Sequence, residues 1–439
     1  MANNKQDKIL NVPNKREQRN VPVLRFPEFE GEWERIPLSD LLEFFSTNSL
    51  SWEQLEYGGN KIQNLHYGLI HVGLPTLVDT KMNELPTIKS EFLPLNYEVV
   101  KEGDVAFADA SEDTNEVAKA VEFVEIGDHP IVCGLHTIHG RDRINLTIPG
   151  FKGYYFGSPS FHNQIRRLAQ GTKIFSISTK ILGECFISIP SKTEQKKIAG
   201  LLSLIDDRIA TQRKIIEDLK KLRSTIGEKL FCSPKDKQPK ARLHGFSDVW
   251  HYVRLSDICD RIRIKNIGEQ CKRVLTIAAQ YGLVSQEEFF HKNVASENLS
   301  NYYLLKKGDF AYNKSYSGDY AWGAVKRLDN YEQGVLSPLY ICFHPNSDKV
   351  DSDFLVYYFE SKKWHKAVAD IAGEGARNHG LLNISIMDYF NTIHCIPSMK
   401  EQKQIAMIMN ALSLKATHEQ HLLNCYIAQR QYLLQQLFI

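Results

Sequence analysis

Two short segments, far apart in the chain, contain side chains of the types that form hydrogen bonds with the edges of nucleic-acid bases. Each segment follows a Lys-x-Gly-Asp sequence and a stretch typical of a β-strand, so the two hold equivalent positions. Amide, carboxylate, hydroxyl and lysine groups can donate to or accept from base edges in the major groove of DNA. We expect residues 109–115 and 313–319 to contact bases, although surface loops also diverge without any function. The candidate contact residues are Asp109, Ser111, Thr114, Asn115, Asn313, Lys314, Ser315 and Tyr316.

Further polar and basic residues are candidates for contacts with DNA, chiefly with its phosphates. Those between residues 61 and 67 lie in a glycine-flanked segment, and Arg141 and Arg143 follow an expected strand. Arg261, Arg263 and Lys265 occupy alternate positions, which would place three cations on one face of an extended chain. Two more follow a glycine at comparable positions in the two halves of the sequence. Such cations suit phosphate contacts, and the alternative is a solvated strand edge. These candidates are Lys61, Gln63, Asn64, His66, Tyr67, Arg141, Arg143, Lys173, Arg261, Arg263, Lys265 and Arg377.

Motifs for catalysis are missing from the sequence. It contains no G-x-x-x-x-G-K-[ST] phosphate-binding loop and no N-P-P-[YF] or D-P-P-[YF] sequence, which marks the pocket of an amino-methyltransferase. The segment from His418 to His421 differs from the zinc-binding H-E-x-x-H motif because its histidines are only three residues apart. We therefore expect a protein that binds rather than reacts, with no catalytic residue, no metal site and no cofactor in this chain.

The composition is that of a globular protein without an excess of positive charge. The 439 residues include 54 Lys and Arg against 52 Asp and Glu, a net charge of +2, and 43% of them are hydrophobic. This excludes a small basic protein that coats nucleic acid by charge alone. The first 20 residues are polar and basic, unlike a signal peptide, no apolar run would span a membrane, and the cysteines are scattered. We expect a cytoplasmic protein.

The chain repeats itself. Arg25, Phe29, Trp33 and Leu38-Ser39-Asp40 return 217 residues later, from Arg242 to Asp257. The Lys-x-Gly-Asp sequence returns after 205 residues, and Ile-Pro-Ser-x-x-Glu-Gln-Lys-x-Ile-Ala returns after 207 residues. Three matches in the same order indicate a tandem duplication with a period of roughly 210 residues, in which each copy is a domain with an appended element.

The first part of each copy has the pattern of a mixed domain. Short branched or aromatic runs bounded by Gly, Pro, Asn or Asp predict strands, and residues 160–169 and 353–371 are predicted helices. The predicted strands are 104–108, 119–125, 131–139, 186–189, 310–313, 322–328, 339–343 and 392–396. We predict the α+β class, with two similar domains built on mixed, largely antiparallel sheets.

Each copy ends in a different pattern, that of a long helix. A Ser-x-x-Glu capping box precedes apolar residues that alternate at spacings of three and four, which is typical of a coiled coil. Because the two helices have matching apolar and polar positions, we predict an antiparallel pair that relates the two copies by a pseudo-twofold axis. The seam consists of Leu202, Ile205, Ile209, Ile216, Leu219, Ile226, Leu230, Met409, Leu412, Leu423, Tyr426, Leu433 and Leu437.

This architecture resembles the specificity (S, HsdS) subunit of type I restriction–modification systems, from about residue 21 onward. The resemblance rests on the Arg-Phe-Pro-x-Phe…Trp opening, the Lys-x-Gly-Asp sequence and the Ile-Pro-Ser-x-x-Glu-Gln-Lys-x-Ile-Ala sequence, each present twice in order. The second opening departs from the pattern, with Leu243-His244-Gly245 in place of Phe-Pro-Glu, and the second helix carries His418 and His421.

The resemblance implies a division of labour between subunits. Two target recognition domains would each bind half of an asymmetric, bipartite DNA site, while the paired helices set the gap and dock two modification (HsdM) subunits. Restriction (HsdR) subunits would join the assembly, and S-adenosylmethionine, ATP and Mg would belong to these partners. The two alternatives are a self-contained adenine DNA methyltransferase or restriction enzyme, and a coiled-coil scaffold that does not recognise DNA.

The same reasoning predicts six segments. They are an N-terminal tail (1–20), the first recognition domain (21–190), the central helix (191–231), a linker (232–241), the second recognition domain (242–397) and the C-terminal helix (398–439).

Overall fold

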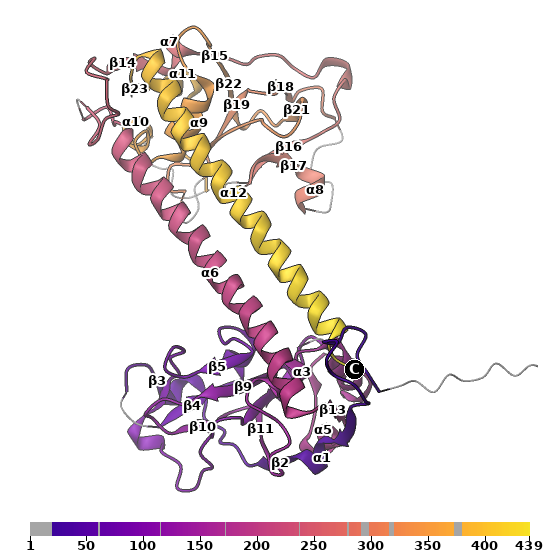
Figure 1. Cartoon of the computed structure of the whole chain (residues 1–439). Coiled ribbons are helices and arrows are strands. Elements are labelled where there is room, and N and C mark those ends of the chain that lie inside the picture. The colour runs from indigo at the N-terminus through magenta and orange to yellow at the C-terminus, as the bar shows by residue number, and fades with distance from the viewer. Residues whose placement is uncertain are drawn as a thin grey trace, which may run out of the picture. The chain divides into compact units, whose positions relative to one another are not determined.

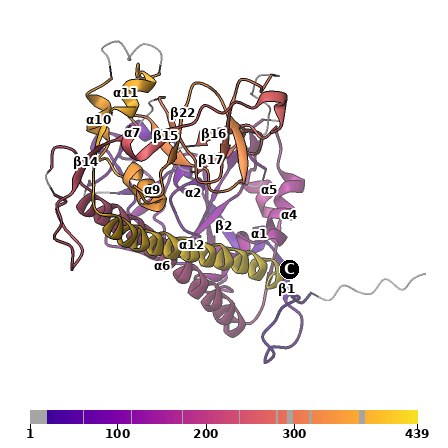
Figure 2. The same ribbon diagram turned by 90° about the horizontal axis from the view of Figure 1, so that it is seen from above.

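The computed structural model divides the chain into two compact units. The first unit comprises residues 1–211 and 423–439, and the second comprises residues 212–422. The structure describes residues 20–59, 62–114, 116–171, 173–236, 238–278, 281–290, 298–315, 320–372 and 380–439. Each unit combines sheets with short helices and with one part of each long helix, as Figures 1 and 2 show. The fold is α+β, as the sequence predicts.

The first unit is built on a five-stranded sheet of order β2-β11-β7-β9-β5 and a four-stranded sheet of order β10-β4-β6-β3. Most neighbours are antiparallel, but β5 lies parallel to β9 and β10 lies parallel to β4. Two-stranded pairs, β1-β13 and β8-β12, complete it. The strands are β1 (Glu34–Pro37), β2 (Leu42–Phe45), β3 (Leu55–Glu56), β4 (Gln63–Leu65), β5 (Leu77–Asp79), β6 (Thr87–Ile88), β7 (Val105–Ala108), β8 (Ala110–Ser111), β9 (Ala120–Glu125), β10 (Ile131–Cys133), β11 (Thr137–Asp142), β12 (Phe175–Ser176) and β13 (Phe186–Ile189).

Short helices and a long one accompany these strands. The helices are α1 (Leu38–Leu41), α2 (Tyr67–His71), α3 (Phe151–Phe156), α4 (Pro159–Leu168), α5 (Thr179–Gly183) and α6 (Lys192–Leu230). A buried core holds Leu65 and Ile70 together with Val78, Ala106 and Phe123 from the five-stranded sheet. The predicted helix at 160–169 is confirmed as α4, whose N-cap Ser158 accepts the N–H of Phe161 and whose first residue is a proline.

The second unit repeats the plan with a smaller central sheet. Its order is β15-β22-β19-β20, all antiparallel, and the other described strands form the pairs β14-β23, β16-β17 and β18-β21. The strands are β14 (His251–Arg254), β15 (Cys259–Arg261), β16 (Leu275–Ala278), β17 (Gly282–Ser285), β18 (Tyr303–Lys306), β19 (Phe310–Asn313), β20 (Ala324–Arg327), β21 (Gln333–Leu336), β22 (Ile341–Pro345) and β23 (Ile393–Ile396). The helices are α7 (Leu255–Ile258), α8 (Gln286–Phe290), α9 (Ser352–Glu360), α10 (His365–Ala369), α11 (Ile386–Phe390) and α12 (Met399–Gln436).

Two predicted elements are corrected by the structure. The helix predicted at 353–371 is two helices, α9 and α10, because Ser361 is extended (ψ 164°) and its hydroxyl bonds to the carbonyl of Tyr358. The strand predicted at 131–139 is likewise two strands, β10 and β11, separated by a turn in which His136 has a positive φ of 54°. The regular backbone hydrogen bonds are interrupted at both places, by a side-chain hydrogen bond at Ser361 and by a turn at His136.

The two long helices begin as the sequence predicts. The glutamate in the first turn of each, however, binds an arginine rather than the backbone N–H that a capping box predicts. Ser191 accepts the N–H of Glu194 at 3.3 Å, which is one half of a capping box. The Glu194 carboxylate instead accepts two hydrogen bonds from Arg25, both at 2.8 Å. In the second unit Glu401 accepts from Arg242 at 3.0 and 2.8 Å. The guanidinium offers the carboxylate a charged bidentate partner, which is stronger than a single backbone N–H.

The apolar seam of the two helices is turned away from solvent throughout. All of its residues are buried or half-buried, including Leu202 and Ile216 in α6 and Met409 and Leu433 in α12. Within the second unit the facing turns run antiparallel, since Gln212 donates to the carbonyl of Glu419 and Arg223, later in α6, donates to the earlier Ser413, both at 3.1 Å. No helix among the residues that the structure describes is long and apolar enough to cross a membrane.

Candidate nucleic-acid interface

The first predicted loop lies beside a second candidate segment in the first unit. Strand β8 pairs antiparallel with β12, which places Ser111 opposite Phe175, and Ile177 donates its N–H to the carbonyl of Asp109 at 2.9 Å. Lys173 is exposed two residues before β12. The fold thus brings candidates from 109–114 and from 173 into neighbouring segments.

A cluster of aromatic rings adjoins the same loop. The Nδ1 atom of His136 lies 3.0 Å from the Oδ1 atom of Asp109. The ring of Tyr67 lies 5.3 Å from that of His136 and 4.7 Å from that of His66, which itself lies 4.5 Å from Trp52. Burial, and after it the nearby His136, lowers the pKa of His66. These contacts hold the half-buried Tyr67 beside the predicted base-contacting loop.

Three other candidates of the first unit bind groups of the protein itself. Asn64 is fully buried and accepts a hydrogen bond from Asn48 at 2.7 Å. Gln63 belongs to β4, between β10 and β6. Arg143 donates to the carbonyls of Asp40 and Ser39, at 2.9 and 3.0 Å.

Arg141 lies in an ionic network beneath the sheet. Its guanidinium donates to both carboxylate oxygens of the buried Asp104, at 2.9 and 2.7 Å, and also to Glu98. His139 lies 2.8 Å from the same carboxylate. Burial alone would raise the pKa of Asp104, but hydrogen bonds from His139 and Arg141 hold it below its usual value. A guanidinium with three acceptors is held in place, so the structural role of Arg141 is clear.

The second predicted loop repeats the arrangement of the first. Leu382 donates its N–H to the carbonyl of Lys314 at 2.9 Å, and Ser315 forms an isolated antiparallel bridge with Leu381. Asn313 ends strand β19, and its side chain accepts the N–H of Ser315 at 3.0 Å. In both units, therefore, the segment after the Lys-x-Gly-Asp strand pairs with the segment that follows the candidate cation of that unit, Lys173 or Arg377.

The alternating cations of the second unit are only partly aligned. Arg261 is the last residue of β15 and is half-buried, and Arg263 is exposed. Lys265 donates to the carbonyl of Asn301 at 2.7 Å and lies 3.6 Å from the centre of the Tyr303 ring. Four predicted contacts lie outside the described residues, namely Lys61, Asn115, Tyr316 and Arg377.

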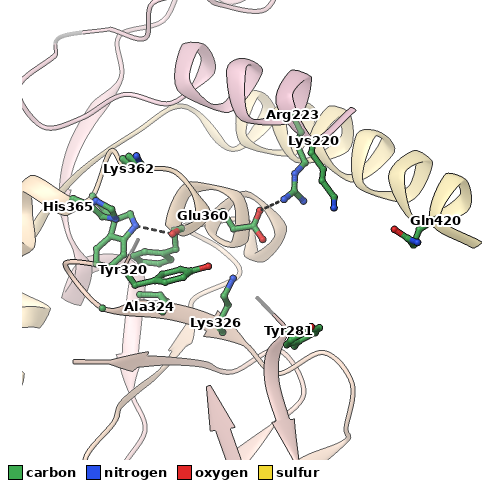
Figure 3. Close-up of a pocket in the computed structure, with 14 residues that line it drawn as sticks. Lys220, Arg223, Tyr281, Tyr320, Ala324, Lys326, Glu360, Lys362, His365 and Gln420 are labelled. Atoms are coloured by element: carbon green, nitrogen blue, oxygen red, sulfur yellow. Dashed lines mark hydrogen bonds and ion pairs between the residues drawn. The ribbon is translucent and has the colours of Figure 1, made fainter. Parts of the chain in front are cut away.

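A basic cleft in the second unit was missed from the sequence. It has a volume of about 740 Å³ and is lined by parts of α6, β20, α9 and the segment before α10, together with Tyr281, Tyr320 and Gln420. Figure 3 shows the side chains of Lys220, Arg223, Lys326 and Glu360 around it. One signal was available: Tyr281-Gly282-Leu283 repeats Tyr67-Gly68-Leu69, so Tyr281 is the counterpart of a candidate in the first copy.

Polar contacts of the long helices repeat in both units. In the first, Tyr154 donates to Asp206 at 3.0 Å, and Arg430 binds the same carboxylate. In the second, Tyr357 donates to Ser413 at 3.2 Å. Among the described residues, no group of three or more His, Cys, Asp or Glu side chains could hold a metal ion.

Comparison with protein families identifies the type of domain. Residues 30–221 match the family described as the type I restriction modification DNA specificity domain. The chain is 27% identical over 263 residues to the specificity subunit of the type I restriction enzyme MjaVIII of Methanocaldococcus jannaschii, a match over 55% of this chain and 58% of that one. It is 30% identical over 139 residues to a Mycoplasma genitalium protein named as a type I specificity subunit, covering 31% and 36% of the two. The matches thus span little more than half, and about a third, of these relatives.

Solved structures show the same fold. The S subunit of a type I restriction–modification system from M. genitalium matches with a TM-score of 0.52 at 16% identity, over 95% of this chain and 99% of that chain. A chain from a structure on complex assembly and conformational transition of the type I system matches with a TM-score of 0.53 at 15% identity, over 92% and 96%.

Proposed function

We propose that the chain is a specificity subunit of a type I restriction–modification system and supplies the DNA sequence specificity of that complex, because residues 30–221 match the DNA specificity domain of such systems. Each recognition domain binds one half of an asymmetric bipartite site. The chain itself is non-catalytic. S-adenosylmethionine, ATP and Mg²⁺ are bound by two modification subunits and by the restriction subunits, which assemble on it in the cytoplasm.

One observation carries this proposal: the two units present different residues at the same place on a repeated framework. The Asp109 and Asn313 segments follow equivalent strands, and each pairs with an equivalent second segment. The scaffold around them is repeated down to single hydrogen bonds. A framework that is kept while its loops differ is suited to two different base sequences.

Exposed apolar side chains on the long helices support a docking role for them. Several apolar side chains on them are exposed, although their seam is buried. Apolar groups in contact with water favour association, because their burial is worth about 25 cal/mol per Å². These exposed residues are Leu204, Ile215 and Leu222 in α6 and Met407, Leu414 and Leu422 in α12. We propose that they contribute to docking the modification subunits.

The loop assignment is tested by exchanging residues 313–319 for the corresponding segment of another specificity subunit. We expect the second half-site alone to change in the motif that the complex methylates, because the first loop lies in the other unit. A uniform loss of affinity with an unchanged motif would show that the loop contacts phosphates only. The matched control exchanges residues 109–115, which should change the other half-site.

The role of the helices is tested by insertion. One whole heptad is added after Ile216 in α6 and another in the facing turn of α12, so that the apolar seam is kept. A heptad is about 10 Å long, which corresponds to about three base pairs of duplex. We expect the gap to lengthen by about that amount with both half-sites unchanged. An unchanged gap would contradict the spacer role.

Two other functions are less well supported. A self-contained methyltransferase would transfer methyl groups as the purified chain, and a scaffold would bind random and specific duplexes equally in the presence of the modification subunits. Assays of both properties on the purified chain and on the complex separate these functions from the proposed one.

A further inference from the structure

Three of the four cations in the basic cleft of the second unit have uncharged counterparts in the first unit. The cations of the cleft are Lys220 and Arg223 from α6, Lys326 from β20 and Lys362 after α9, against one carboxylate, Glu360. Arg223 lies 3.6 Å from Glu360. Across the described residues, no ion pair involves the other three cations. The cleft therefore keeps an excess of positive charge.

The repeat shows that the three lysines are particular to the second unit. Aligning Tyr154-Tyr155-Phe156 with Tyr357-Tyr358-Phe359 places Pro159 at the position of Lys362. The strand registers β7–β9 and β19–β20 place Val121 at the position of Lys326. The helix offset of 207 residues places Ile427 at the position of Lys220. At all three positions the first unit has an uncharged residue where the second unit has a lysine.

The sheets differ at the same place. In the first unit β9 is covered by the parallel strand β5, in which Val78 is fully buried. In the second unit the corresponding strand, β20, ends the central sheet among the described residues. Residues 323–326 line the cleft in succession, although Gly323, Ala324 and Val325 are themselves buried. Thus β9 has a further strand partner, β5, where β20 has none among the described residues.

The equivalent arginines of the two units, Arg430 and Arg223, also have different partners. In the first unit Arg430 binds the Asp206 carboxylate and donates to Thr76, the residue before β5, at 3.1 Å. In the second unit Ser413 replaces that aspartate, and Arg223 donates to its hydroxyl at 3.1 Å. The first arginine is paired with Asp206, whereas the second is paired with Glu360 and lines the cleft.

We propose that this cleft binds the sugar–phosphate backbone of the DNA duplex, as a contact that is made by the second unit and not at the equivalent place in the first. The proposal rests on the DNA-binding function above. Lysines without acidic partners suit phosphates because each contact releases a counterion, and the contact is independent of sequence. Tyr281 and Tyr320 at the cleft can add hydrogen bonds to phosphate or sugar oxygens. The two half-sites would accordingly differ in how strongly salt weakens their binding.

The test uses the full chain purified with its modification subunits. In one variant Lys220, Lys326 and Lys362 are all changed to alanine. In a matched control, the exposed Lys229, Lys349 and Lys403 of the same unit are changed to alanine. Binding of duplexes with the methylated motif and of random duplexes is measured between 50 and 300 mM salt. We expect the slope of log affinity against log salt to fall by about two to three in the cleft variant, with about a 30-fold loss of affinity at 150 mM. The motif and the control should be unchanged.

A second variant keeps all three lysines of the cleft. Ser413→Asp places beside Arg223 the carboxylate that the first copy has at Asp206, and we expect it to lower both affinity and salt slope. Thermal unfolding verifies that each variant is folded, and if the triple variant is not, Ser413→Asp gives the result.

The outcomes distinguish the cleft from the function. A wild-type complex that prefers its motif, with a cleft variant of unchanged slope, would overturn the cleft proposal alone. Loss of modification subunits from the variant complex would also overturn it, since the cleft would then bind a protein. A wild-type complex without sequence preference would contradict the proposed function, and its slope on random duplex would still test the cleft.

Discussion

The two copies of this chain share the contacts that join each domain to the long helices and differ in the parts that face outward. Leu24 donates its N–H to the carbonyl of Gln436 in the first unit, and Ala241 donates to that of Lys229 in the second, both at 3.0 Å. These are equivalent residues at the offsets of 217 and 207. This bond between domain and helix is thus repeated in both units.

Aromatic and amide contacts repeat in the same way. Trp33 packs edge-on against Phe151 at 6.3 Å, and Trp250 packs against Phe354 at 6.5 Å. Gln195 and its counterpart each donate to the carbonyl five residues earlier, at 2.9 Å. The difference between the copies lies elsewhere, in the charge beneath the sheet, in the contact loops and in the basic cleft. A duplicated domain can therefore acquire a new binding surface while its attachment stays fixed.

The largest difference in stability is expected at the aspartate of the Lys-x-Gly-Asp sequence. Asp104 is buried with His139 and Arg141, whereas Asp309 pairs with His344, whose side chain is 59% exposed. Asp104→Ala leaves the buried His139 ring without that carboxylate and removes one of the two carboxylates that bind the half-buried Arg141, and it should cost about 4 kcal/mol. Asp309→Ala should cost about 1 kcal/mol, because solvent screens the pair. Hydrogen exchange of peptides from each unit measures the two losses separately, and equal losses would contradict the comparison.

The contribution of Asp104 to the stability of the first unit should also depend on pH. The folded pKa of Asp104 lies below its unfolded value of about 3.9. Its carboxylate therefore stabilises the first unit above about pH 4, and that contribution is lost as the pH falls through the lower folded pKa. We expect Asp104→Asn to be less stable than wild type at pH 7 and to lose less further stability than wild type on acidification. Urea unfolding at pH 7 and at successively lower pH provides the measurement. A parallel pH dependence in the two proteins would refute this role.

A smaller difference is expected where each long helix begins. Glu194 accepts from Arg25 and, at 3.3 Å, from the indole N–H of Trp33. Glu401 accepts from Arg242, but the indole N–H of Trp250 has no hydrogen-bond partner among the described residues. Glu194→Ala should cost about 3 kcal/mol and Glu401→Ala about 2 kcal/mol, because only the first change also leaves the indole N–H of Trp33 without an acceptor. Denaturation curves that rank the two variants in the opposite order would count against this reading of the junction.

The smallest effect is expected from giving the first copy the polar group of the second. Asp206→Ser removes the carboxylate that binds Arg430 and Tyr154 but keeps a hydroxyl, as Ser413 does for Arg223 and Tyr357. We expect a loss of about 1 kcal/mol, because both partners are only partly buried. The conservative Asp206→Asn is the control, and a loss above about 3 kcal/mol in Asp206→Ser would show that the two junctions are not equivalent.

Much of the fold could be predicted from the sequence because its signals are local and repeated. The seam of α6 and α12 follows from spacings of three and four, and every seam residue is indeed buried or half-buried. The break between α9 and α10 was missed, yet the first copy marks it with Gly157-Ser158-Pro159. Aligning the copies there would have predicted it, since proline favours the first turn of a new helix.

The candidate contacts were less predictable because residue type does not reveal a partner inside the protein. Arg141 has the side chain of a phosphate ligand, but Asp104, distant in sequence, holds it. The basic cleft lies where β20 ends its sheet among the described residues, which only the sheet order shows. Comparing Lys326 with Val121 through strand register would have indicated the change of charge, though not that the position is open.

The central claim, that the two units bind separate half-sites, is tested most directly by sequencing the methylated bases of a host that carries this chain with its modification subunits. The account predicts one asymmetric motif made of two specific parts separated by a gap of fixed length, with only one part changing when residues 313–319 are exchanged. A single contiguous motif, or a change in both parts, would contradict it.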